Sequence, residues 1–210
     1  MNNCDITISG GKGKHEYVDL GLPSGTLWAT YNVGATKPSE YGNYFAWGET
    51  KPKTIYDWET YKWCKGSDDS MSKYCTSNNY GLVDDKTFLE AEDDTAITNW
   101  GKEWRMPTFE ELQEMLNGCI WKWVKDFNGT GVAGQLGTSK TNSATIFFPA
   151  AGYLDESNHL CGDEGYYWSS SLHKSYSDGA YCLDFGSEYI NLYDDSRSYG
   201  RSVRAVVRLS

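Results

Sequence analysis

The chain has 210 residues and a mass of 23.7 kDa, enough for one domain with a substantial core or two small ones. Its 19 Lys and Arg residues against 29 Asp and Glu residues give a net charge of −10, which argues against a general nucleic-acid binder. Aromatic residues are unusually frequent at 15%, while no run of about 18 apolar residues occurs and the first residues do not resemble a signal peptide, so we expect no membrane insertion.

The first half of the chain predicts short strands and long loops. Residues 1–14 are expected to be a flexible lead-in, because the glycines at 10, 11 and 13 follow no strand that would make them a phosphate-binding loop. Residues 51–99 are polar and too long for a plain connection, so they are either a functional insertion or a segment ordered on its aromatic side chains. Alternating or apolar runs bounded by Gly and Pro predict strands at residues 17–20, 27–29 and 44–47.

One helix is clearly predicted, beginning after Thr108. Thr108 and Glu111 have the spacing of a capping box, apolar residues follow at helical spacing, and Asn117-Gly118 is a stop signal. Strands are expected after it at residues 120–124 and 146–151, where Pro149 indicates a bulge or a sheet edge.

The C-terminal region predicts well-patterned strands. Leu183 alternates with Phe185, Ile190 alternates with Leu192, and the apolar residues from Val203 to Leu209 alternate with polar ones in a closing strand. Four arginines gather at this end of the chain and are expected to pair with acidic neighbours rather than to bind an anion: Arg197, Arg201, Arg204 and Arg208.

Residues 165–200, which we call the variable segment, have an unusual composition. They contain 7 Tyr, 8 Ser, 4 Asp and 4 Gly, and outside an apolar framework almost all side chains are Tyr, Ser, Asp, Gly, His or Asn. Antibody paratopes use the same set, because Tyr offers a large, stiff, amphipathic contact area and Ser, Gly and Asn offer adaptable hydrogen bonding. The alternative is a polar surface loop whose tyrosines cap the core.

The codons of these residues share a further property. Tyr, Ser, His and Asp codons can each lie one base change from the Asn codon AAC, which fits adenine-directed diversification of a template. Lys174 and Glu188 do not fit and would have to be fixed in that template.

Six motifs, in order from about residue 15 to 209, resemble those of the FISUMP domain, the major paralogous domain of gut Bacteroidetes. They are YVDLGLPSGTLWA (17–29), YFAWGET (44–50), WGKEWRMPT (100–108), FPAAGY (148–153), YWSSS (167–171) and GRSVR (200–204). The resemblance implies an α+β, C-type-lectin-like fold of the formylglycine-generating-enzyme branch, with short antiparallel sheets, few helices and long loops. A single domain would then cover residues 15–210.

Some relatives in that fold are variable proteins of diversity-generating retroelements, which display diversified ligand-binding residues on the C-terminal strands and loops. By this resemblance the ligand-binding residues would be Tyr166, His173, Ser175, Tyr176, Asp178, Tyr181, Asp184, Tyr189, Asn191, Tyr193, Asp194, Asp195, Ser198 and Tyr199.

The resulting expectation is a non-catalytic domain that recognises a protein or glycan on another cell or host. The alternative is a structural or adhesive subunit of a pilus tip, a cell surface or a phage tail. The resemblance places either one at the cell surface, in the secreted fraction or in a phage virion.

Catalytic and metal chemistry find little support in the sequence. The calcium signatures of sugar-binding C-type lectins are missing, and the acidic group at residues 155–164 lacks the spacing of a calcium loop. Cys161 and Cys182 do not resemble the paired cysteines of formylglycine-generating enzymes, and the three histidines suggest no catalytic triad. We therefore expect no enzyme activity, no metal and no cofactor. Of the six cysteines, a Cys64–Cys75 pair is possible, but most are expected to be free.

Overall fold

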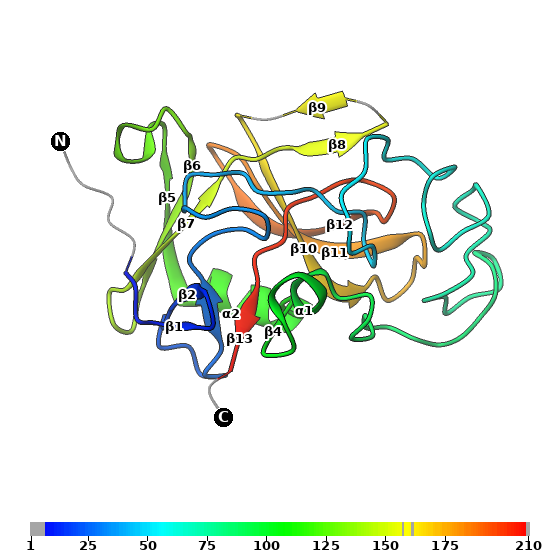
Figure 1. The fold of residues 1–210 in the computed structure, drawn as a ribbon, viewed down its shortest axis with the longest axis horizontal. Helices are drawn as coiled ribbons and strands as arrows, with labels where there is room; N and C mark the ends of the chain where they lie inside the picture. The colour runs from blue at the N-terminus through cyan, green and yellow to red at the C-terminus, as the bar shows by residue number, and fades with distance from the viewer. Residues whose placement is uncertain (1–6, 157, 161, 209–210) are drawn as a thin grey trace.

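The protein is mostly β-structure, with short antiparallel sheets and few helices (Figure 1). The computed structural model describes residues 7–156 and 162–208 with their side chains and residues 158–160 by their backbone. This architecture agrees with the expected small α+β fold. No helix among these residues is long and apolar enough to cross a membrane.

A five-stranded sheet joins the first strands of the chain to the last. Its order is β1 (Gly10–Lys12), β2 (His15–Val18), β3 (Leu27–Ala29), β13 (Val206–Val207) and β4 (Trp104–Arg105). The first of these strands lies inside the segment expected to be a flexible lead-in, and that expectation is wrong for Gly10–Lys12, which pair with β2. Val206–Val207 form β13 within the expected closing strand. The preceding Gly200, Arg201 and Ser202 make isolated bridges to Leu154, Phe45 and Tyr167, and Leu209 lies outside the described residues.

The predicted helix is confirmed as α2 (Phe109–Gly118). Thr108 accepts a hydrogen bond from the Glu111 N–H, and the Glu111 side chain accepts one from the Thr108 N–H, which completes the capping box. A second helix, α1 (Thr95–Trp100), was not predicted. It has six residues, too few for a legible periodicity, and is capped by the Asp94 carboxylate, which accepts from the Ala96 and Ile97 amides.

The predicted strands after α2 are also confirmed. They belong to a second sheet, of β5 (Cys119–Val124), β6 (Gly134–Ser139) and β7 (Thr145–Pro149), with a short 3-10 helix at Phe127–Gly129 between the first two. Pro149 ends the edge strand β7. Because the strand lies at the sheet edge, the N–H that proline lacks is not needed for a hydrogen bond between central strands. The β8 (Tyr153–Asp155) and β9 (Asn158–Leu160) hairpin follows.

The long segment at residues 51–94 is ordered by aromatic packing rather than by regular secondary structure. Tyr56, Tyr61, Met71 and Cys75 are buried in one hydrophobic cluster with Tyr44 and Ala46. This confirms one of the two alternatives for this segment. The neighbouring residues 44–47, expected to be a strand, make only a single β-bridge, from Phe45 to Arg201.

The variable segment forms the third sheet, of β10 (Gly165–Leu172), β11 (Gly179–Phe185) and β12 (Ile190–Ser196). Its central strand is buried on both faces. Leu183 and Phe185 pack into a core with Trp28 and the α2 side chain of Leu112, whereas Cys182 packs on the opposite face with Trp168. The middle of the sheet therefore lies between two cores, and the sheet reaches solvent at both ends of β11 and along β12.

Candidate ligand-binding surface

The register of the third sheet brings several predicted binding residues to one face. Tyr166 on β10 lies opposite Asp184 on β11, which lies opposite Asn191 on β12; Tyr193 pairs with Cys182, and Asp195 pairs with Ala180. Directly opposed residues in an antiparallel sheet point to the same side. We call this side the tyrosine face and define it by Tyr166, Asp184, Asn191, Tyr193 and Asp195.

Tyr189 and Tyr199 extend the tyrosine face at its edges. The Tyr189 hydroxyl donates to Asp184 Oδ1 and Glu164 Oε1, both at 3.2 Å. The Tyr199 ring lies 5.8 Å from the ring of Tyr153, which in turn contacts the Tyr166 ring at 5.1 Å. Tyr153 is thus a member of this surface that the sequence did not single out, since it lies outside the variable segment.

A second group of predicted residues gathers at the turn between β10 and β11. We call it the histidine cluster: the His173 ring stacks on Tyr176 at 4.9 Å and meets the Tyr181 ring edge-on, while its Nε2 is 3.9 Å from Asp194 Oδ1. The backbone N–H groups of Ser175 and Tyr176 donate to His173 Nδ1. Asp178 lies in the same turn and is half-buried.

The side chains expected to face outward differ in exposure. Tyr193 is 59% exposed and Tyr176 53% exposed, whereas His173 is 8% and Ser198 1% exposed. The expectation of an outward position is wrong for His173, whose ring organises its turn, and for Ser198, whose Oγ lies 2.9 Å from Ser196 Oγ. The other exposed members are Ser175, Tyr189 and Asn191, and the half-buried ones are Tyr166, Asp178, Tyr181, Asp184, Asp194, Asp195 and Tyr199.

Arg201 fixes the base of the tyrosine face. Its side chain is buried, donates to Cys182 Sγ at 2.9 Å and forms an ion pair with Asp195. Its guanidinium lies over the rings of Tyr166 and Trp168, at 4.5 and 4.7 Å from their centroids. These contacts fix the side-chain rotamers of Tyr166 and Asp195 on the tyrosine face.

The expectation that the C-terminal arginines pair with acidic neighbours is only partly right. Arg201 pairs with Asp195 and Arg208 pairs with Glu111. Arg197 and Arg204 are instead fully buried and donate to neutral oxygens, such as the Ser177 carbonyl and the Asn32 side chain. Sequence alternation does not distinguish such arginines from surface ones.

The carboxylates of the tyrosine face are bridged by tyrosine hydroxyls. Tyr166 donates to Glu164 Oε2 at 2.7 Å, and Tyr189 links Glu164 with Asp184. Burial raises the pKa of Asp184, and burial together with the Glu164 carboxylate raises the pKa of Tyr166. The phenols therefore stay protonated and act as donors at neutral pH.

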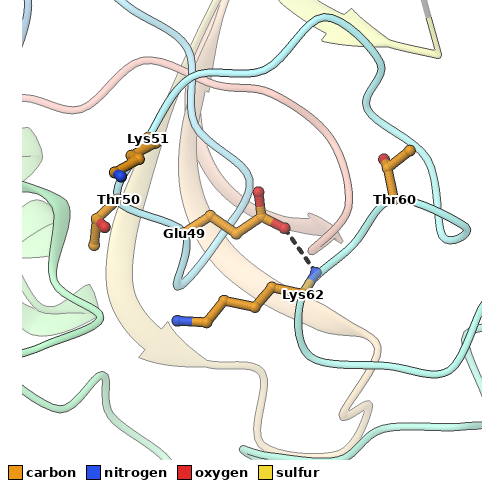
Figure 2. Close-up of a pocket in the computed structure, with 5 residues that line it drawn as sticks. All are labelled: Glu49, Thr50, Lys51, Thr60 and Lys62. Carbon is orange, nitrogen blue, oxygen red and sulfur yellow. Dashed lines mark hydrogen bonds between the residues drawn. The ribbon is translucent and has the colours of Figure 1, made fainter.

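A pocket of about 320 Å³ outside the variable segment is lined by Glu49, Thr50, Lys51, Thr60 and Lys62 (Figure 2). The Glu49 carboxylate accepts from the backbone N–H of Lys62 at 2.8 Å and from Lys53 Nζ at 3.0 Å, both through Oε1. Its carbonyl accepts from Thr95 Oγ1. Glu49 therefore ties the segment at 51–94 to α1, a role that its contacts explain structurally.

Among the residues with described side chains, the closest group of potential metal ligands is Glu90, Glu92 and Asp93. Lys73 Nζ lies 2.5 Å from Glu90 Oε2 and 2.6 Å from Asp93 Oδ2, so ammonium groups already balance these carboxylates. The acidic group weighed from the sequence at residues 155–164 falls partly outside the described side chains. Within it, Glu164 is bound to tyrosine hydroxyls.

The described cysteines, Cys64, Cys75, Cys119 and Cys182, are free, so the Cys64–Cys75 pair is not formed. Cys182 is fully buried, and burial raises the pKa of its thiol to about 12. A thiol with that pKa is protonated at neutral pH and is a poor nucleophile. Cys161, its possible catalytic partner, lies outside the described residues.

Comparison with known proteins gives one match. Residues 136–206, about a third of the chain, are similar to the family model described as "Domain of unknown function (DUF8237)". The matched stretch runs from β6 to β13 and contains the whole variable segment. No curated protein and no solved structure matches the chain.

Proposed function

We propose that the protein is a non-catalytic ligand-binding domain, whose variable segment recognises a protein or glycan on another cell or host. The observation that carries this proposal is a contrast in exposure within the third sheet and the turn between β10 and β11. Tyr193 and Tyr176 are more than half exposed, while Trp168, Cys182 and Leu183 beside them are fully buried. A rigid frame that presents exposed tyrosines at little conformational cost is what a recognition surface needs.

The support of the tyrosine face favours recognition over a mobile surface loop. The phenols of Tyr166 and Tyr189 are held by Glu164, and Arg201 is buried beneath Tyr166. Side chains that are already ordered lose less conformational entropy when a partner binds. The surface is therefore pre-organised.

The finer fold assignment, a C-type-lectin-like domain resembling FISUMP domains, is part of the same proposal. Two observations support it: the last strand of the chain pairs beside an early one, and the motif residues Trp28, Trp47, Trp104 and Trp168 are buried framework. Diversification by a retroelement would be supported by a neighbouring reverse-transcriptase gene and a near-copy of the coding segment for residues 165–204 that differs only at adenines. Differences spread over all four bases would contradict it.

A photo-crosslinking experiment tests the binding role. The photoreactive amino acid benzoyl-phenylalanine replaces Tyr193 in the full chain, and a matched chain carries it at Ile120, which is 62% exposed on β5. After irradiation with bacterial or host cells, we expect a discrete adduct from position 193 that the Tyr176→Ala substitution weakens. Equal labelling from both positions, or no adduct from position 193, would contradict the proposal.

A further inference from the structure

A second hollow, of about 200 Å³, lies where the variable segment meets the β5-β6-β7 sheet. One wall is formed by Trp121 and Trp123 of β5, and the other by the turn from β11 to β12, including Glu188 and Tyr189. Gln135 of β6 lies opposite Trp123 in the register and also lines the hollow. We call it the tryptophan pocket; its size suits one side chain rather than a large ligand.

The indole walls are held in place. Trp121 Nε1 donates to the Leu116 carbonyl at 3.1 Å, and its ring meets Phe148 edge-on at 5.9 Å. The ring lies across Gly137, where an added Cβ would come within 2.7 Å of it, so only glycine leaves that space. Trp121 is half-buried and lines the pocket.

Gln135 leaves an unpaired acceptor at this site. Its Nε2 donates to the Gly186 carbonyl at 2.9 Å, and because a carbonyl only accepts, this bond fixes the orientation of the amide. The Gln135 side chain is 4% exposed, and its Oε1 is buried without a hydrogen-bond partner. Gln135 therefore joins the two walls of the pocket, but its closed-off Oε1 offers no acceptor to a ligand.

The electrostatics of the pocket favour a cation. Glu188 lines it directly, and the Tyr189 hydroxyl is bound to the carboxylates of Glu164 and Asp184. No Lys, Arg or His is among the lining residues, and Lys122 points to the other side of β5 because side chains alternate along a strand. Indole faces attract cations through their negative quadrupole, most strongly when water is excluded.

We propose that the tryptophan pocket binds a primary ammonium or a guanidinium group, the end of a lysine or arginine side chain of the recognised partner. The group would pack against the indole of Trp123 and be neutralised by Glu188. The inference rests on the proposed function only in assigning this group to the partner. The tryptophan pocket would add a contact beside the exposed tyrosines that selects for a positively charged side chain.

The test uses the full chain labelled with ¹⁵N at its nine indoles. Nα-acetyl-lysine methylamide and Nα-acetyl-arginine methylamide are titrated separately, and the Trp121 and Trp123 signals are assigned with Trp→Phe variants. We expect either ligand to shift these two signals, with the preferred one identifying the group. The trimethyl-lysine analogue should bind more weakly because it has no N–H to donate to Glu188, and the uncharged norleucine methylamide, whose side chain lacks the ammonium nitrogen, should not bind.

Glu188→Gln provides the decisive variant, since Glu188 is exposed and the change preserves size. We expect it to weaken binding about tenfold and to remove most of the salt dependence. Ile120→Ala, on the opposite side of β5, is the matched control and should bind like the wild type. Equal binding of the norleucine compound, an unchanged affinity in Glu188→Gln, or shifts produced only by a neutral methyl glycoside would overturn the proposal.

The ligand proposed for the pocket and the proposed function can be refuted independently. Tyr176→Ala and Tyr193→Ala change residues that do not line the pocket, so they should leave binding of the small amide intact. A specific adduct from position 193 without amide binding would refute the pocket alone. Amide binding without any specific adduct would refute the cellular target and leave the pocket standing.

Discussion

Glu111 links α2 to Thr26, Arg105 and Arg208, and replacing it tests how these segments are held together. The Arg105 guanidinium donates to both carboxylate oxygens, at 2.5 and 2.6 Å, and Thr26 Oγ1 donates to Oε1 at 2.8 Å. Burial alone would raise the pKa of Glu111, but the hydrogen bonds and the charge of Arg105 outweigh it and lower this pKa to about 2. The carboxylate is therefore much more stable in the folded protein than in the unfolded chain.

The magnitude follows from that difference. A carboxyl with an ordinary pKa of 4.5 that falls to about 2 on folding contributes about 3 kcal/mol to the free energy of unfolding. Because the folded pKa is the lower one, this contribution is present above about pH 4.5 and is lost as the pH falls towards 2. Glu111→Gln keeps the size and a capping-box residue at this position but removes the charge.

Urea unfolding followed by tryptophan fluorescence measures the effect. At neutral pH we expect Glu111→Gln to lose about 3 kcal/mol of unfolding free energy. Near pH 3 the gap between variant and wild type should be much smaller, since the wild-type carboxyl is losing its advantage. Glu110→Gln, on the exposed side of the same helical turn, is the matched control and should change stability by about 0.5 kcal/mol or less. A gap between Glu111→Gln and wild type that stays constant as the pH falls would refute the reasoning.

Three further predictions follow from burial. Tyr193→Ala should leave the melting temperature nearly unchanged because this ring is 59% exposed, whereas Tyr167→Ala should cost about 3 kcal/mol or more in a chemical denaturation experiment. Iodoacetamide should label Cys64 in the native protein and spare Cys182 until the chain is unfolded, as peptide mass spectrometry can show; early labelling of Cys182 would contradict its burial. Arg204→Lys should destabilise the protein by about 3 kcal/mol, measured by urea unfolding, because one ammonium cannot replace a guanidinium that donates to three residues at once.

Features with local causes could be predicted from the sequence. The capping box at Thr108 and the alternation of Leu183 with Phe185 are set by neighbours a few residues away, and α2 and β11 lie where these patterns indicate. The composition of the variable segment indicated a paratope-like surface, which stays a prediction. The register then determines which of its tyrosines share a face.

Features with distant causes could not be predicted. His173 lies in a polar run that suggests exposure, yet it is buried and contacts Tyr181 of β11 and Asp194 of β12. The tryptophan pocket depends on the bond from Gln135 to Gly186, across 51 residues of sequence. The sequence signal for this pocket is the Trp-x-Trp spacing of Trp121 and Trp123, which places both indoles on one face of β5.

Arg197 joins two regions that the sequence presents as separate. Its buried guanidinium donates to the carbonyls of Lys73 and Tyr74 in the long aromatic segment and to that of Ser177 in the turn after β10. Opening the long segment would leave a buried charge without its acceptors, so the two regions should unfold together. The long segment should then be as protected from proteases and hydrogen exchange as the third sheet, although it contains no helix or strand.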